Sequence, residues 1–238
     1  MERTIEITNE RSGVKENSGN RSAALMVAFA AAYLLAVKVV TKLIPGRGAS
    51  VMFISISYIV LGTAGLYIFR EDFKKGLEAW REHTLKSALW LIGGFLANSL
   101  LMSLAYLPSM MLYPDYEGIN DNNIDVAMQL MPAPLFVMAA GVMGPLAEEA
   151  FFRFILVDKA KRKLPVMLCV TASSVLFMFW HVHALIPQDI LINLPKLVTS
   201  VIFCVTMQCS GNKTIPSVIH VFGNTSALIM MLMSSAYN

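Results

Sequence analysis

Apolar stretches about as long as a membrane crossing alternate with short polar segments along most of the chain. A transmembrane helix needs about 20 predominantly apolar residues, and lipid-exposed segments must satisfy their own backbone hydrogen bonds, which favours helices. We therefore predict an all-α, multi-pass transmembrane helical bundle with about seven membrane spans. The predicted spans are Ala23–Ile44, Ser50–Phe69, Ser87–Tyr113, Gln129–Val157, Leu164–Ile186, Ile190–Cys209 and Ile215–Ser234.

The polar segments give a simple domain organisation. Residues 1–22 are polar, with four Lys or Arg and four Glu, and we interpret them as a tail because a secretory signal would place an apolar core closer to the start. No long linker interrupts residues 23–238, so we expect one transmembrane domain. The fourth span is longer than one bilayer thickness and must tilt, kink or project into water. Pro145 is the candidate irregular point in it.

Composition supports a membrane protein. The 238 residues are 56% hydrophobic and 15% charged, whereas soluble domains average about 45–50% apolar and about 25% charged residues. The net charge of +3 is small and gives no indication of a nucleic-acid partner.

Basic residues are distributed unevenly between the predicted loops. The tail holds four Lys or Arg, segment 70–86 five, segment 158–163 four and the turn at Lys213 one, which makes fourteen, whereas the opposite loops hold only Arg47 and Lys196. Cytoplasmic loops carry the excess of Lys and Arg. We therefore predict a cytoplasmic N-terminus.

Two connecting segments have a character of their own. Arg70–Lys86 alternates charge at helical spacing and predicts an amphipathic helix at the cytoplasmic interface, in contact with membrane lipid. Tyr113–Met128 is acidic, but its carboxylates do not follow the order of an EF-hand. We expect it to be a solvated loop.

Three polar clusters lie inside apolar stretches, where ionisable groups persist if they pair, line a wet cavity or do chemistry. In the first, Glu149 and Arg153 are four residues apart and share a helix face. Glu148 points about 100° away from Glu149. One acid can thus be neutralised by Arg153 while the other faces a cavity as a general base. The alternative is that all three residues form one closed ion-pair cluster between helices.

The other two clusters contain histidines. His181 and His183 are two residues apart and point to different sides of a helix, so we expect only one of them in the site. His220 and Asn224 share a helix face one turn apart and can both donate hydrogen bonds to a developing oxyanion. Alternatively, either pair could serve packing alone.

The three clusters together resemble the CPBP family of intramembrane proteases, also called the Abi or type II CAAX prenyl endopeptidase family. The family shows the motifs E-E-x-x-x-R, F-x-x-x-H and H-x-x-x-N in this order on separate helices. In this chain they are Glu148-Glu149 with Arg153, Phe177 with His181, and His220 with Asn224. The resemblance covers roughly residues 144–226. His183 also fits the second motif with Phe179, and we prefer His181 because the small residues before Phe177 resemble the family's approach to that motif.

The resemblance implies roles for these side chains. Glu148 would activate water, and His181 would hold or polarise that water. His220 and Asn224 would stabilise the oxyanion, while Glu149 and Arg153 would orient the others. If a metal takes part, zinc on Glu148, His181 and His220 is the expected arrangement. A glutamate-activated water needs no cofactor, and we favour that chemistry.

The sequence thus predicts an intramembrane endopeptidase that processes a membrane-associated or exported peptide, of pheromone or bacteriocin type, or a CAAX-like lipidated tail. We favour a bacterial plasma membrane, because the chain shows no eukaryotic targeting signal. The rival hypotheses are a catalytically silent scaffold or immunity protein of the same fold, and a transporter. Intact motifs argue against the scaffold, and the lack of paired broken helices argues against the transporter.

Overall fold

The structure is a computed structural model that describes residues 22–236, and the regular elements of this part of the chain are all helices, without a strand. Six of its helical segments are long and apolar enough to cross a membrane. They are Ser22–Leu43, Arg47–Ile68, Thr84–Leu112, Ala133–Arg162, Pro187–Ser210 and Thr214–Ser234. The predicted multi-pass helical bundle is confirmed, with each boundary close to its predicted position. Residues 1–21 of the predicted tail lie outside the described residues.

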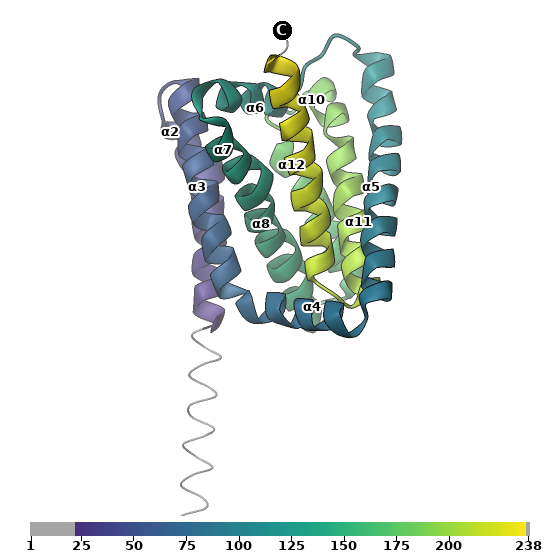
Figure 1. The fold of residues 1–238 in the computed structure, drawn as a ribbon. Helices are drawn as coiled ribbons and strands as arrows, with labels where there is room; N and C mark the ends of the chain where they lie inside the picture. The colour runs from purple at the N-terminus through teal and green to yellow at the C-terminus, as the bar shows by residue number, and fades with distance from the viewer. Residues whose placement is uncertain (1–21, 237–238) are drawn as a thin grey trace, which may run out of the picture.

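The elements follow one another with short connections, and Figure 1 shows them side by side in the bundle. The first span contains η1 (Leu35–Val40) and α2 (Thr41–Leu43) and is followed by α3 (Arg47–Ile68), α4 (Arg70–Glu82), α5 (Thr84–Leu112) and α6 (Ile119–Leu130). The fourth span consists of α7 (Ala133–Phe136), η2 (Val137–Met143), α8 (Gly144–Glu149), η3 (Ala150–Lys159) and η4 (Ala160–Arg162). After it come α9 (Val166–His181), α10 (Pro187–Ile192), α11 (Leu194–Ser210) and α12 (Thr214–Ala236).

The predicted fifth span is shorter than expected, because α9 ends at His181 after 16 residues instead of continuing to Ile186. The carboxylate of Asp189 accepts the backbone N–H groups of His183 and Ala184, at 2.7 and 2.9 Å. These N–H groups therefore do not bond helical carbonyls. Pro187 additionally restricts the residue before it to extended backbone, and Ile186 has ψ 151°. The predicted seven spans are thus six long helices and one shorter apolar helix.

The two ends of the bundle differ in what covers them. Helix α4 lies across one end, beside the start of the described chain, and α6 and α10 lie at the opposite end, near the C-terminus (Figure 1). Lys213 joins α4 to the bundle, since its Nζ donates to Asp72 Oδ1 and to Asp158 Oδ2, each at 2.7 Å. The basic segments 70–86, 158–163 and Lys213 therefore share one end, as the charge count predicts. That this end faces the cytoplasm stays a prediction.

The acidic segment Tyr113–Met128 is not the solvated loop that we expected, because α6 begins within it at Ile119. Ala127 is buried, and Ile124 and Met128 pack with it against the cluster around Val51 of α3. These apolar residues recur at helical spacing, so burying them stabilises the helix. As a result, α6 forms a cover over one end of the bundle.

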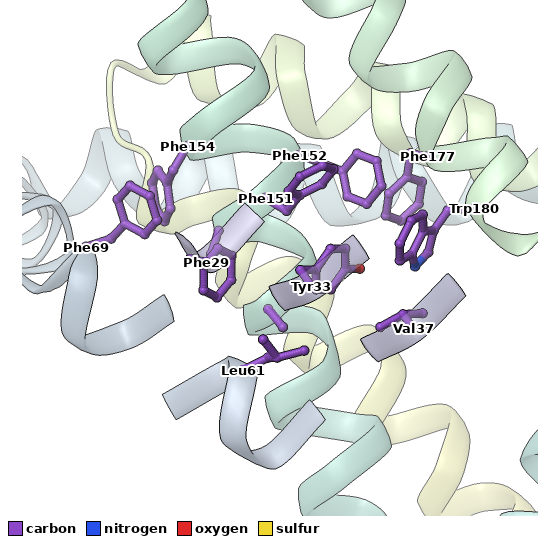
Figure 2. Close-up of a cluster of buried hydrophobic side chains, with 12 residues drawn as sticks. Phe29, Tyr33, Val37, Leu61, Phe69, Phe151, Phe152, Phe154, Phe177 and Trp180 are labelled. Carbon is purple, nitrogen blue, oxygen red and sulfur yellow. The ribbon is translucent and has the colours of Figure 1, made fainter. Parts of the chain in front are cut away.

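A large cluster of buried apolar side chains joins the first span to the later helices. Tyr33 is fully buried, and its ring stacks on Trp180 of α9 at 4.8 Å and on Phe151 of η3 at 5.0 Å between centroids. Figure 2 shows these rings together with Phe152 and Phe177. Because aromatic rings bury large apolar areas, this cluster fixes the first span against α9.

The fourth span has an irregular backbone around α8. Two π-helical segments, η2 and η3, flank the α-helical turns that carry the paired glutamates. Pro145 lies at the junction of η2 and α8, where its missing N–H interrupts the hydrogen bonds of a continuous helical span. π-Helical turns inside α-helices occur often at functional sites. The predicted irregularity near Pro145 is confirmed: the backbone changes there from π-helix to α-helix and back to π-helix.

Candidate active site

The two glutamates of α8 are buried and have different surroundings. Glu148 is 7% exposed and lines a cavity of about 380 Å³, whereas Glu149 is fully buried and does not line it. The rotation of about 100° between successive helix residues separates the two carboxylates. One acid therefore faces the cavity and the other faces the protein interior.

Glu149 is held by two buried basic groups. Its Oε1 lies 3.4 Å from Arg153 Nε and 3.0 Å from His220 Nδ1. The Arg153 side chain is also fully buried, with its guanidinium carbon 4.5 Å from the ring centroid of Phe177 and 5.3 Å from that of Phe203. Aromatic faces attract a desolvated cation, so this surrounding complements the ion pair. The sequence-predicted pairing of Glu149 with Arg153 is present in the structure.

Two imidazole rings flank the carboxylate of Glu148. His181 Nε2 lies 4.0 Å from Oε1, and His220 Nε2 lies 3.6 Å from Oε2. His181 Nδ1 is 2.8 Å from the carbonyl oxygen of Phe177. Since a carbonyl only accepts, Nδ1 of His181 carries a proton and its Nε2 can face Glu148 as an acceptor.

Phe177 connects the parts of the cluster. Its ring centroid is 4.8 Å from that of His181 and 6.0 Å from that of His220, in addition to its contact with Arg153. Its side chain is buried. Phe177 therefore packs against both histidines and the arginine, and its carbonyl fixes the orientation of His181.

The cavity gathers the remaining candidate residues. Asn224, one turn after His220 on α12, lines it together with Glu148 and His181. His183 lines it as well, but lies beyond the end of α9. Burial and then the nearby Lys38 lower the pKa of His183, only partly offset by Asp189. Of the two histidines, His181 is the one whose ring lies beside Glu148.

The three motifs come together only through the packing of their helices. Counted from the predicted span edges, Glu148, His181 and His220 would lie at different depths in straight, parallel helices. In the structure the span that contains α8 runs obliquely between its neighbours (Figure 1), and the three side chains meet. Their catalytic roles stay predictions.

The sequence reasoning missed a group of cavity residues outside the motifs. Lys38, Lys42 and Arg47 from the start of the chain and Lys196 of α11 all line the cavity. Trp180 and Tyr58 line it too. Lys38 and Lys42 did carry a signal, because an ionisable residue inside a span is a functional candidate by default. The sequence alone offered no way to place them beside Glu148.

The arrangement of donor side chains bears on metal binding. Within residues 22–236, no group of three or more His, Cys, Asp or Glu side chains is arranged to hold a metal ion. Zinc on Glu148, His181 and His220, and metal dependence altogether, stay predictions.

Comparison with known proteins adds a family to this geometry. Residues 129–226 match the family model described as type II CAAX prenyl endopeptidase Rce1-like. This segment is similar to the Rce1-like domain of the type II CAAX prenyl endopeptidases. It contains every motif residue of the cluster, while Lys38, Lys42 and Arg47 lie outside it. Searches of curated proteins and of solved structures found no match to the chain.

The family and the six long apolar helices agree with each other. The chain is a multi-pass membrane protein with an Rce1-like domain in its second half. The resemblance seen in the three motifs is thereby confirmed at the level of the family.

Proposed function

We propose that this protein is an intramembrane endopeptidase in which Glu148 activates a water molecule for attack on a peptide bond. The observation that carries the proposal is the position of Glu148 in the cavity, between His181 Nε2 and His220 Nε2. Both separations are longer than a direct hydrogen bond of about 2.7–3.2 Å. A small polar molecule that bridges an imidazole and the carboxylate is therefore well accommodated.

The reaction follows general base catalysis. Glu148 takes a proton from water, the resulting hydroxide attacks the carbonyl carbon of the peptide bond, and the same carboxyl group returns the proton to the departing amine. His181 Nε2 accepts a hydrogen bond from the attacking water and orients it. No step requires an oxidant or another co-reactant.

Oxyanion stabilisation is assigned to His220 and Asn224. Nδ1 of His220 donates to Glu149, and its Nε2 faces Glu148 Oε2 at 3.6 Å. Asn224 lines the cavity one turn after His220 on the same helix. Donors placed in advance where negative charge develops are the largest catalytic contribution in many enzymes.

The substrate we propose is a peptide or a lipidated protein tail that reaches the cavity from within the membrane. The family model supports a peptide or protein substrate, and we place the protein in a bacterial plasma membrane, processing a membrane-associated or exported peptide. This assignment rests on the sequence argument and on the family.

The test compares peptide profiles by mass spectrometry in native membranes that contain the wild type, Glu148→Gln, His181→Ala or the control Glu78→Gln, each at equal abundance. Glu78 is an exposed carboxylate of α4, so its substitution changes charge far from the cavity. A peptide cut with the wild type and the control, and left intact with both site variants, supports the protease. Identical profiles for all four proteins overturn it in favour of a non-catalytic scaffold.

A further inference from the structure

Four cationic side chains and a single carboxylate line the cavity. Lys38, Lys42, Arg47 and Lys196 contribute the positive charges, and Glu148 is the one acidic residue of this lining in the described chain. The acidic residues of α6 do not line it, although Asn120 and Asn123 of the same helix do. The cavity is therefore electropositive outside its catalytic carboxylate.

These four residues are also exceptional in the distribution of charge along the chain. The other basic residues of the described part are Arg153, which pairs with Glu149, and those in segments 70–86, 159–163 and at Lys213. Those segments lie at the α4 end of the bundle, away from α6 and α10 (Figure 1). The end of the bundle opposite α4 thus has few cations, and they line one cavity.

The hydrogen bonds of Lys38 and Arg47 go to neutral groups. Lys38 Nζ donates to the backbone carbonyl of Trp180 and lies 4.6 Å from the centroid of its indole ring. Arg47 Nε donates to Asn123 Oδ1 at 3.1 Å. Among residues 22–236, no carboxylate lies within 4.0 Å of the charged nitrogens of any of the four. Lys38 and Lys196 are partly buried, where a charge without a counter-charge is costly, whereas Lys42 and Arg47 are exposed.

Two of the cations share the cavity wall with Glu148 and His181 and interact with them electrostatically. Lys196 interacts electrostatically with Glu148 and with His181. Lys38 interacts with Glu148, and its hydrogen-bond acceptor Trp180 directly precedes His181 in the chain. An anion bound between these lysines would lie in the same cavity as Glu148.

We propose that Lys38 and Lys196 bind a carboxylate of the substrate peptide close to the scissile bond, either its free C-terminus or an acidic side chain. Lys42 and Arg47 extend the same positive field along the cavity and attract the peptide to it. This inference rests on the proposed function, because it assigns the specificity of that site. A peptide is favoured over a lipid headgroup as the source of the anion, since the same cavity contains Glu148, His181 and Asn224.

The test uses an internally quenched apolar peptide library in four matched forms. Its C-terminus is a free carboxylate or an amide, and the residue after the variable segment is Glu or Gln. Hydrolysis is measured with purified protein in vesicles of neutral lipid and in vesicles with anionic lipid. Binding of the same four forms to Glu148→Gln protein is measured in parallel, so that specificity can be read without turnover.

The wild type is expected to prefer one acidic form over its amide by about tenfold or more in kcat/KM. A tenfold preference corresponds to about 1.4 kcal/mol, which is the size of contribution that a hydrogen bond between charged groups makes. Lys196→Gln and Lys38→Gln should lose this preference through KM with little change in kcat. Lys196→Arg should retain it. Lys74→Gln, an exposed lysine of α4, is the matched control and should behave as the wild type.

The outcomes separate the two proposals. Equal binding and equal hydrolysis of acidic and amide forms overturn the carboxylate site and leave the protease intact. Hydrolysis that depends on anionic lipid but not on peptide charge overturns it as well, in favour of a lipid phosphate at the lysines. Absence of hydrolysis of any form by the wild type counts against the protease, while the binding preference still decides the carboxylate site.

Discussion

The carboxylate of Glu149 accepts a hydrogen bond from Nδ1 of His220 at 3.0 Å, and both side chains are buried. This contact joins the first sequence motif to the third across 71 residues of chain. It directs the other ring nitrogen of His220 toward Glu148. The second glutamate of the pair therefore positions a histidine, while the first faces the cavity.

Loss of the Glu149 charge is expected to destabilise the protein strongly. Glu149→Gln leaves the fully buried Arg153 without its counter-charge, and breaking a buried pair in this way costs about 3–5 kcal/mol. Thermal unfolding of purified protein in detergent measures the effect. The double variant Glu149→Gln/Arg153→Met should recover part of the loss, because it removes both charges at once. A double variant less stable than Glu149→Gln would contradict this account of the pair.

His181 and His183 are expected to differ in their effect on activity. His181→Gln should lower kcat by about 100-fold or more, in the range of lost proton-transfer or water-orienting groups, because its Nε2 lies beside Glu148. His183→Gln should stay close to the wild type, since His183 lies beyond the end of α9. Initial rates on the cleaved peptide, at equal protein concentration, decide between them. The reverse order of activities would assign the second motif to His183.

Lys213 is expected to stabilise the docking of α4 in a pH-dependent way. Burial opposes the charged form, but hydrogen bonds to Asp158 and Asp72 outweigh it, so that the pKa of Lys213 lies above its ordinary 10.5. A raised folded-state pKa contributes stability that is complete below the unfolded-state pKa and is lost as pH rises through the folded-state value. Lys213→Met should therefore cost about 1–2 kcal/mol at neutral pH.

Unfolding temperatures of the wild type and Lys213→Met, measured from pH 7 to 11, check this prediction. The difference between the two proteins should be constant up to about pH 10 and should shrink above it. Lys75→Met, at an exposed site on the same helix, provides the control. A difference that grows toward high pH would exclude the ion pairs as its source.

Activity is expected to survive removal of metal. Dialysis against EDTA followed by assay in metal-free buffer should leave the rate unchanged, because a carboxylate and two imidazoles are sufficient to activate water in the mechanism proposed. Loss of activity that zinc restores would contradict it. In that case Glu148, His181 and His220 are the donors to examine by substitution and metal analysis.

Much of the architecture could be read from local sequence. Hydropathy placed the long helices within a few residues of their observed ends, since the requirement for about 20 apolar residues acts on each segment separately. The exceptions depend on contacts that the apolar pattern of a single helix does not report. Asp189 ends α9 by accepting the N–H groups of His183 and Ala184, and packing on α3 turns an acidic loop into α6.

The candidate site was predicted unevenly for the same reason. The motif residues were found because their types and spacing within a helix are local properties. The cavity cations were not, because Lys38 meets the carbonyl of Trp180 across 142 residues. No periodicity within one helix reports which other helix will lie against it.

The sequence by itself determined the membrane class, the helical spans and the residues able to carry out hydrolysis. These properties follow from the free-energy cost of exposing polar backbone and polar side chains to lipid. Each membrane-spanning segment has to avoid that cost by its own sequence. Only the tertiary structure decided that Glu148 faces the cavity, that His181 and His220 flank it and that four cations share its walls. Those relationships arise from helix packing, where shape and charge from distant parts of the chain must fit together.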